Sequence, residues 1–298
     1  MIRQSRLRRL GLIALALAVL LPVTGPSSAA PDTGPVRRVL NLTGYPDHTV
    51  AVPAHMPLPD TATGIGPGSL IITEIPGEGT FGCTANFIWE GNGRTFLGSA
   101  GHCFLPETKT ATHGSGNDYD ARGVKTRVCV SGCVLGSTVL GFGGQMVELG
   151  PVAYARQTGD GGDIGNDFGL VEIPAGANIR ASMAMWGGPV RHGPLAVGDI
   201  TCHYGNGLGL GEVYLTKGRL GTAGLFSDEV AWFAATASTP GDSGAAMATC
   251  RQDANGVHGD KAIGVLTHLS SLGIAGTTMS RAKTLAGQAG LLITARLG

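Results

Sequence analysis

Charged side chains are scarce in this 298-residue sequence, and the two signs balance. Asp, Glu, Lys and Arg make up 14% of the residues, with 21 basic and 21 acidic side chains and no net charge. A typical soluble domain is ~25% charged. Nucleic acids and anionic membrane surfaces attract proteins through clustered positive charge. We therefore expect neither of them to be the main partner of this chain.

Long apolar segments are also missing after residue 30, where no stretch reaches the ~18 uncharged apolar residues that a membrane span requires. Within residues 1–30, four arginines (Arg3, Arg6, Arg8 and Arg9) precede an uncharged run over 10–23 and small residues over 27–30. This order is typical of a secretory signal peptide, and the run is too short for a comfortable membrane anchor. The sequence therefore predicts an exported, extracellular protein.

Glycine is abundant where charge is scarce, with 50 residues, which favours short strands and tight turns over long charged helices. From Ser69 onward, β-branched and apolar runs alternate with Gly-rich punctuation, as in a barrel or sandwich. The predicted strands cover 70–75, 84–89, 124–130, 168–173, 213–216, 230–234 and 262–267. A single C-terminal helix is predicted from the spacing of Ala282, Leu285, Ala289 and Leu292.

The chain divides by composition into a leader and one large region. Residues 31–64 are rich in Pro, Thr, Asp and Gly, which predicts a removable pro-segment or flexible leader. Residues 65–298 then form the main domain, and the stretch 174–194, with Gly-Gly-Pro and few strand formers, predicts the connection between two β units. These units would cover about 65–175 and about 190–298.

Six cysteines in an exported protein predict three disulfides. Zinc is the alternative, because Cys129 and Cys133 lie four residues apart and His203 follows Cys202. No second Cys/His pair has a zinc-finger spacing, so disulfides are favoured. Calcium is a second alternative. Its candidate ligands are Asn117, Asp118 and Asp120, in a polar loop that needs no ion to explain it. We predict neither a metal nor a cofactor.

Three short stretches carry residues suited to nucleophilic catalysis. Gly241-Asp242-Ser243-Gly244 is a serine between glycines that let the backbone turn sharply. Ser99-Ala100-Gly101-His102-Cys103 places an imidazole beside a cysteine, and Asn166-Asp167-Phe168 begins a predicted strand with a carboxylate. A serine needs a general base and a group that orients the base before it attacks at neutral pH. The three stretches offer one residue of each kind.

In the order His, Asp, Ser these stretches resemble the chymotrypsin family of serine proteases, since subtilisins and α/β-hydrolases use other orders. The resemblance covers about residues 65–298. It implies an all-β fold of two six-stranded antiparallel β-barrels with a short C-terminal helix. It also implies a secreted, monomeric endopeptidase, often made as an inactive precursor, that acts on polypeptides and is open to protein inhibitors. Gly101 and Ala245 replace the family's common Ala and Gly, which affects local backbone geometry only.

The resemblance assigns a role to each residue of the site. His102 would take the proton of Ser243 and pass it to the leaving amine, while Asp167 would orient His102. The N-H groups of Gly241 and Ser243 would form the oxyanion hole. Thr267 corresponds to a family serine that supports the aspartate and whose strand pairs with the substrate.

The resemblance also pairs the cysteines. It implies a Cys83–Cys103 bridge beside the catalytic histidine and a Cys202–Cys250 bridge in the C-terminal unit. Cys129 and Cys133 remain to pair locally, and this pairing has the least precedent in the family.

For specificity, the resemblance places Ala237 at the base of the primary pocket, with Ser238, Thr267, His268 and Leu269 along its walls. No carboxylate lies at the base, so we expect cleavage after uncharged residues and not after Arg or Lys. A preference for acidic residues through His268 is the alternative. Asp242 resembles a carboxylate that pairs either with a freed N-terminus, such as Ile65, or with an internal base. The sequence leaves this choice open.

Several other residues compete for these roles. Asp160 and Asp163 lie near Asp167, but in a Gly-rich stretch that predicts a turn. The remaining histidines have no comparable setting and are expected to be structural or exposed: His48, His55, His113, His192, His203, His258 and His268. Two other functions also compete, a protease-like binding protein without catalysis and a secreted esterase on the same scaffold.

Overall fold

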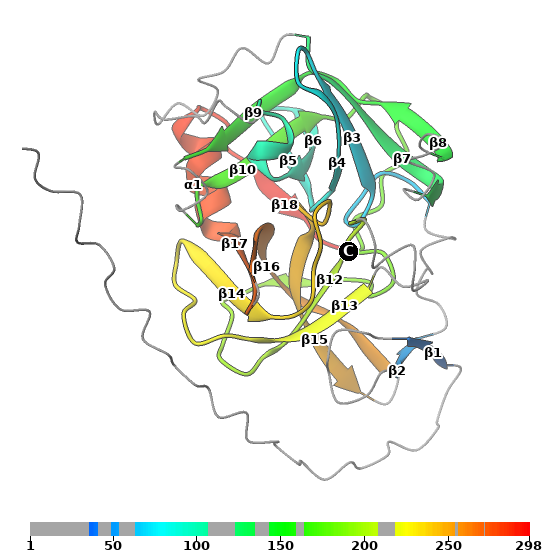
Figure 1. Ribbon diagram of the computed structural model, residues 1–298, viewed down its shortest axis with the longest axis vertical. Helices are drawn as coiled ribbons and strands as arrows, with labels where there is room; N and C mark the ends of the chain where they lie inside the picture. The colour runs from blue at the N-terminus through cyan, green and yellow to red at the C-terminus, as the bar shows by residue number, and fades with distance from the viewer. Residues whose placement is uncertain are drawn as a thin grey trace, which may run out of the picture. The chain divides into compact units, whose positions relative to one another are not determined.

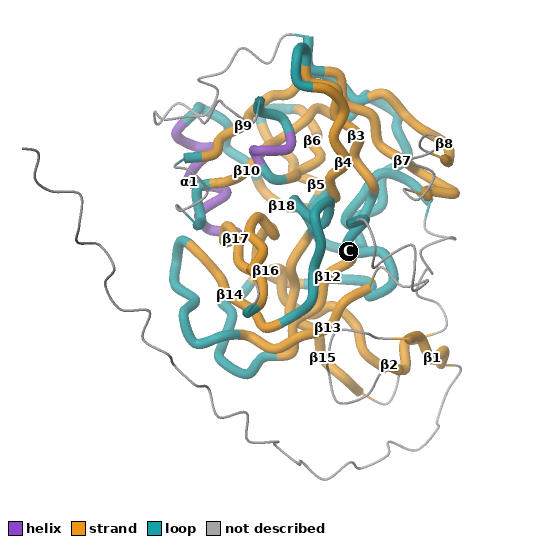
Figure 2. Tube along the Cα trace, in the orientation of Figure 1, coloured by secondary structure: helices purple, strands orange, loops and turns teal. Residues whose placement is uncertain are grey.

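The computed structural model describes the strands at 36–40 and 49–53 and residues 63–106, 123–134, 143–158, 164–207, 218–253, 256–270 and 272–298. All of them belong to one compact unit, Asp32–Gly298. Strands dominate this part of the chain, and its one α-helix lies near the C-terminus (Figure 2). The predicted all-β class with a C-terminal helix is therefore confirmed. The predicted signal peptide, residues 1–30, lies outside the described residues.

Six strands of the C-terminal half pair in a ring. The order is β16 (Gly256–Ser270), β15 (Ala246–Asp253), β12 (Ile200–Tyr204), β13 (Gly218–Ala223), β14 (Ala231–Ala235) and β17 (Gly273–Thr278), and β17 pairs back to β16. All of these pairings are antiparallel. A short strand, β11 (Arg191–His192), adds to β16 in parallel. Figure 1 shows these strands as one group.

The N-terminal half contains two antiparallel sheets. One has the order β4 (Gly79–Thr84), β3 (Leu70–Ile75), β7 (Lys125–Val134) and β8 (Gly143–Glu148). The other has the order β18 (Thr294–Arg296), β5 (Ile88–Gly91), β6 (Arg94–Ser99), β10 (Asp167–Glu172) and β9 (Val152–Gln157). No pairing between described strands joins the two sheets, so the predicted six-stranded barrel of this half is not reproduced by the pairings.

The C-terminal strand and helix tie the two halves together. α1 (Met279–Gln288) follows β17 of the C-terminal ring, and β18 after it pairs with β5 of the N-terminal half. The helix buries Met279, Ala282 and Leu285, two of which belong to the predicted apolar stripe. The predicted helix is too long, because the chain leaves the helix at Ala289 and Gly290 follows with a φ of 80°. Leu292 is therefore exposed.

The predicted strands agree with the structure in most places. Strands over 70–75, 124–130, 168–173, 230–234 and 262–267 match β3, β7, β10, β14 and β16, whereas 213–216 lies outside the described residues. The run 84–89 is not one strand but the end of β4 and the start of β5. Within 174–194 only β11 is a named strand, in keeping with a connection. The leader contains a two-stranded antiparallel sheet, β1 (Val36–Leu40) with β2 (Thr49–Pro53).

Apolar packing lies within the N-terminal sheets and also across the junction of the two halves. One cluster, which includes Ile71, Ile88, Leu97, Phe104 and Val171, lies within the N-terminal sheets. A larger cluster joins Trp89 and Phe168 to Trp186 and to residues of β12, β16 and α1. The core is therefore continuous across the junction of the halves. No helix of the described residues has the length and apolar character needed to cross a membrane.

Candidate active site

His102 lies in a short 3-10 turn, Gly101–Cys103, that follows the end of β6. Cys103 in this turn is bonded to Cys83 at the end of β4, with an S–S distance of 2.01 Å. Gly101 faces the backbone of Arg156 so closely that a Cβ there would lie 2.0 Å from the Arg156 carbonyl oxygen. Only glycine fits at this position, which explains why the sequence departs from alanine before the histidine.

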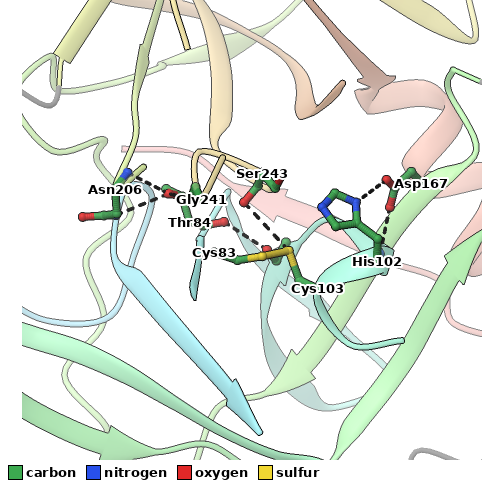
Figure 3. The surroundings of a disulfide bond; sticks show 9 residues. Cys83, Thr84, His102, Cys103, Asp167, Asn206, Gly241 and Ser243 are labelled. Carbon is green, nitrogen blue, oxygen red and sulfur yellow. Dashed lines mark hydrogen bonds and ion pairs between the residues drawn. A yellow bond between two sulfur atoms is a disulfide. The ribbon is translucent and has the colours of Figure 1, made fainter. Parts of the chain in front are cut away.

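Asp167 is the first residue of β10, and its side chain is 1% exposed. One carboxylate oxygen, Oδ2, lies 2.6 Å from His102 Nδ1, and the other, Oδ1, accepts a hydrogen bond from His102 N at 3.1 Å. The His102 side chain remains 28% exposed. The carboxylate therefore fixes both the backbone and the ring of His102 and leaves the opposite edge of the ring open (Figure 3).

The surroundings of His102 shift its titration. Burial lowers the pKa of His102, but attraction by the Asp167 carboxylate and the hydrogen bond that His102 donates to it outweigh burial. The net result is a pKa raised above the ordinary value of 6.5. The imidazole is therefore a stronger base than a free histidine, and its protonated form is stabilised.

Ser243 is brought to the histidine turn by close backbone packing. Its carbonyl accepts a hydrogen bond from Thr84 N at 2.8 Å and lies 3.9 Å from Cys103 Sγ. A Cβ on Gly244 would lie 2.0 Å from Ser99 Oγ and clash, so this approach requires glycine. In Figure 3 the ring of His102 lies between Ser243 and Asp167. Residues 140 positions apart therefore meet at the junction of the halves.

The turn before Ser243 leaves two N-H groups available. Gly241 has a φ of 101°, which favours glycine, and Asp242 N donates to Thr239 O at 3.0 Å. By contrast, no described residue accepts a hydrogen bond from the N-H of Gly241 or of Ser243. The bonded N-H of Asp242 therefore lies between two free N-H donors, one on each side. Such donors can bind a negatively charged oxygen.

Asp242 is fully buried and has internal partners. Its Oδ1 accepts from Gly207 N at 2.7 Å, and its Oδ2 accepts from Ser238 Oγ at 2.7 Å and from Thr239 N at 2.9 Å. The buried guanidinium of Arg219 also attracts this carboxylate. In this conformation Asp242 is thus satisfied from within the C-terminal half.

Ile65, the freed terminus considered from the sequence, lies elsewhere in the structure. It is buried, and its N-H donates to Asn178 O at 2.8 Å. Together with Ile179 it forms an isolated parallel bridge. In the uncleaved chain Asp242 therefore has internal partners, and the pairing with a freed Ile65 amine stays a prediction.

Thr267 does not contact the aspartate. Its hydroxyl lies 2.7 Å from Nδ1 of the neighbouring His268. A different threonine, Thr277 of β17, holds Asp167 instead: Thr277 Oγ1 donates to Asp167 O at 2.7 Å and accepts from Asp167 N at 3.3 Å. The sequence did not point to Thr277, because only the packing of β17 against β10 brings this hydroxyl to Asp167.

The residues expected along the specificity pocket lie on two segments. Ala237 and Ser238 follow β14 and are half-buried, and the Ser238 hydroxyl is turned to Asp242. Thr267, His268 and Leu269 lie at the end of β16, past the last β15 pairing at Val265. There His268 and Leu269 pair with β17 on one side, and Thr267 lies at an irregularity of this pairing, while on the other side no described strand pairs with them. Leu269 is 39% exposed.

Several other candidates lie outside the described residues: Asn117, Asp118, Asp120, Asp160, Asp163, His48, His55, His113 and the side chain of Cys133. Of the remaining histidines, His203 is 0% exposed, and burial lowers its pKa to about 4 despite attraction by Asp242. His258 pairs with Asp253 at 3.4 Å. No contact between these histidines and the His102–Asp167 pair occurs among the described residues.

The cysteines are structural. The two bridges described are Cys83–Cys103 and Cys202–Cys250, the second with an S–S distance of 1.99 Å, and Cys129 is also disulfide-bonded. His102, Cys83 and Cys103 form a cluster with metal-ligand spacing. The sulfur atoms of that cluster are bonded to each other, so they are not available as thiolate ligands.

A buried carboxylate that orients a histidine beside a serine is the side-chain arrangement that Ser-His-Asp hydrolases use, on several unrelated folds. No protein-family model matches the sequence, and no curated protein matches it.

Among solved structures, the chain is similar to protease A of Thermobifida fusca, with 17% identity over 78% of this chain and 99% of that one and a TM-score of 0.44. It is also similar to a chymotrypsin of Cellulomonas bogoriensis, with 18% identity, 78% and 99% coverage and a TM-score of 0.44. A third is a glutamic-acid-specific serine protease, with 15% identity, 77% and 100% coverage and a TM-score of 0.46. The function of this chain is therefore inferred from its own residues.

Proposed function

We propose that this chain is a secreted serine endopeptidase that hydrolyses peptide bonds through an acyl-enzyme on Ser243. The observation that carries the proposal is the 2.6 Å contact between His102 Nδ1 and the buried carboxylate of Asp167. A buried carboxylate in this position fixes the tautomer of the imidazole and stabilises its protonated form. The nitrogen on the open edge of the ring, Nε2, is then the base for Ser243.

The reaction has two halves. In the first, Ser243 Oγ attacks the substrate carbonyl carbon while His102 Nε2 takes the hydroxyl proton. The tetrahedral intermediate collapses when His102 gives this proton to the leaving amine, and an ester on Ser243 remains. In the second half a water attacks the ester, His102 again takes and returns the proton, and the acid product leaves.

The free N-H groups of Gly241 and Ser243 complete the mechanism. Negative charge develops on the substrate oxygen only after attack, so donors aimed at that position stabilise the transition state more than the substrate. One such donor is worth on the order of 3 kcal/mol. Asp242 supports this arrangement, because its three hydrogen bonds hold the turn between the two donors.

The end of β16 is the proposed substrate-binding edge. An extended peptide can add to an unpaired strand edge through main-chain hydrogen bonds, and residues 267–269 lie past the β15 pairing next to the serine turn. Ala237 provides no charge for a basic residue. We therefore infer a preference for uncharged residues at the cleaved bond.

Export is part of the proposal. Disulfides persist in oxidising compartments, and the bridges described here agree with an extracellular protein. The basic and apolar order of residues 1–30 supplies the expected signal. The proposed partners are polypeptide substrates and protein inhibitors, with a monomer as the active form and an inactive precursor before processing.

A matched pair of proteins tests the proposed function. The secreted wild-type protein and its Ser243→Ala variant are profiled on a peptide library and on small esters. We expect peptide cleavage after uncharged residues in the wild type only. Cleavage of esters without peptides favours the esterase, the absence of both favours a binding protein, and a profile dominated by Arg, Lys or Glu contradicts the proposed specificity.

A further inference from the structure

Thr84 binds both ends of the turn that carries Ser243. This residue is 0% exposed and directly follows Cys83 at the end of β4. Its N-H donates to Ser243 O at 2.8 Å, and its hydroxyl donates to Gly241 O at 2.9 Å. Its carbonyl accepts from Ser99 Oγ at 3.0 Å. Figure 3 shows Thr84 beside both residues of the turn.

The hydroxyl of Thr84 has a fixed direction. It accepts a hydrogen bond from Asn206 N at 2.9 Å, so its single proton is directed to Gly241 O. Asn206 is anchored in turn, because its Nδ2 donates to Gly68 O at 2.8 Å. A side chain of the N-terminal half therefore joins two loops of the C-terminal half, one at Asn206 and one at Gly241.

The hydrogen bond from the Thr84 hydroxyl to Gly241 O lies at a glycine, the residue type whose backbone rotates most easily. Gly241 has a φ of 101°, and a glycine without a restraining contact can rotate its peptide groups at little cost. Holding Gly241 O fixes the plane of the peptide between residues 241 and 242. Holding Ser243 O fixes the plane of the peptide between residues 243 and 244. The Ser243 N-H belongs to the peptide between these two planes and is limited from both sides, whereas the Gly241 N-H lies one peptide earlier and is limited from one side.

We propose that Thr84 is a positioning residue for the oxyanion hole, and that its hydroxyl keeps the Gly241 and Ser243 N-H groups directed at one point. The inference rests on the proposed function. The N-H contact to Ser243 O is available to any residue except proline, whereas the contact to Gly241 O requires the hydroxyl of Thr or Ser. The hydroxyl is therefore the part of Thr84 that the proposal concerns.

The test compares Thr84→Val, which has the same shape without the hydroxyl, with Thr84→Ser, which keeps it. For each variant of the full secreted chain, kcat and KM on a peptide substrate are measured with inhibition by a peptide aldehyde, which forms a tetrahedral adduct with the serine. We expect T84V to lower kcat about 10²-fold and to weaken aldehyde binding by a similar factor, with KM changed less than ~3-fold. T84S should stay within ~3-fold of wild type.

Two further measurements separate positioning from stability. Thr249→Val is the matched control, because Thr249 is also buried and its hydroxyl accepts from Lys261 N at 3.1 Å, away from the serine turn. It should lose stability without losing kcat. The acid limb of kcat/KM against pH should be the same in T84V and wild type, since the His102–Asp167 pair is untouched.

Each contrary result overturns a specific part of the proposal. A kcat for folded T84V within ~3-fold of wild type, or an equal loss in T84S, overturns the role of the hydroxyl. An equal loss in T249V assigns the effect to stability and overturns it as well. If T84V does not fold, Thr84→Ala supplies the same comparison. A wild-type protein that cleaves no peptide overturns the proposed function itself.

Discussion

The pKa of His102 is the property of a single residue that most directly governs the proposed reaction. Burial lowers this pKa, but the charge and hydrogen bond of Asp167 raise it by more, so that it lies above the ordinary 6.5. Protonated His102 cannot take a proton from Ser243. We therefore expect kcat/KM to fall as the pH drops through this raised pKa, with the acid limb above pH 6.5, as measured in a pH-rate profile. An acid limb below pH 6.5 contradicts this assignment.

Replacing Asp167 by Asn tests which carboxylate orients the histidine. Asp167→Asn keeps the shape but donates to Nδ1 where the carboxylate accepts, which stabilises the wrong tautomer. We expect kcat to fall about 10⁴-fold, in steady-state assays on a peptide substrate. Near-normal turnover would mean that another acid, such as Asp160 or Asp163, fills the role.

The Thr277 hydroxyl holds the backbone of Asp167, and we predict that this contact contributes to the free energy of unfolding. β6 ends at Ser99, opposite Gly169, and offers Asp167 no strand partner, so the Thr277 hydroxyl binds the N-H and C=O of Asp167 instead. In Thr277→Val two buried backbone groups lose their partner, at about 1–3 kcal/mol each. Urea unfolding should show this loss, and Thr277→Ser should recover most of it. Equal stability of T277V and wild type contradicts this contact.

Single residues also show where prediction from sequence stops. The order of His102, Asp167 and Ser243 is visible in the sequence, because each stands in a short motif with its neighbours. Thr84 and Thr277 are ordinary strand residues in the sequence. Their roles depend on which segments meet at the junction of the halves, and no local pattern encodes that.

At the scale of elements, the run 84–89 explains why a continuous apolar stretch can fail as a strand. Asn86 lies within it and is fully buried. Its Oδ1 accepts from the N-H of Phe87 at 2.8 Å and from the indole of Trp89 at 3.0 Å. The first of these bonds gives the Phe87 N-H a side-chain partner in place of a backbone one, at the point where the chain passes from β4 into β5. An asparagine within an apolar run is therefore a signal that the run can be divided between two strands, and a prediction from apolar periodicity alone does not use it.

The Cys83–Cys103 bridge links β4 to the histidine turn, and both segments contact the serine turn. Removing it in a Cys83→Ala, Cys103→Ala double variant frees a loop with a sequence separation of 20 residues. We expect a loss of about 3 kcal/mol in the free energy of unfolding, measured by guanidinium denaturation, and lower kcat. Stability equal to that of wild type would contradict a structural role for this bridge.

At the scale of the whole molecule, His203 predicts how stability depends on pH. Burial lowers its pKa to about 4 in the folded state, whereas the unfolded value is about 6.5. Between these values the unfolded chain binds more protons, so folding stability is lost as the pH falls from about 6.5 to about 4. Urea unfolding over this range should show the loss, and His203→Leu should reduce it. An unchanged slope in the variant contradicts the assignment.

The fold as a whole was predictable in class but not in connectivity. Alternating apolar runs and glycine-rich turns predict strands, and the C-terminal spacing predicts one helix. The return of β18 to β5 and the pairing of β14 with β17 join strands that lie far apart in the chain. Such pairings follow from shape and register across the molecule, which a single sequence does not display.

The activation of Ser243 is the central claim, and a serine-directed phosphonylating reagent tests it most directly. Such a reagent reacts with a serine whose hydroxyl proton is taken by a nearby base, and not with an ordinary surface serine. Mass spectrometry of the treated protein should show one phosphonyl group per chain, located on Ser243. The label should be lost in Ser243→Ala and strongly reduced in His102→Ala. A wild-type protein that stays unlabelled, or a label on another residue, would contradict the account.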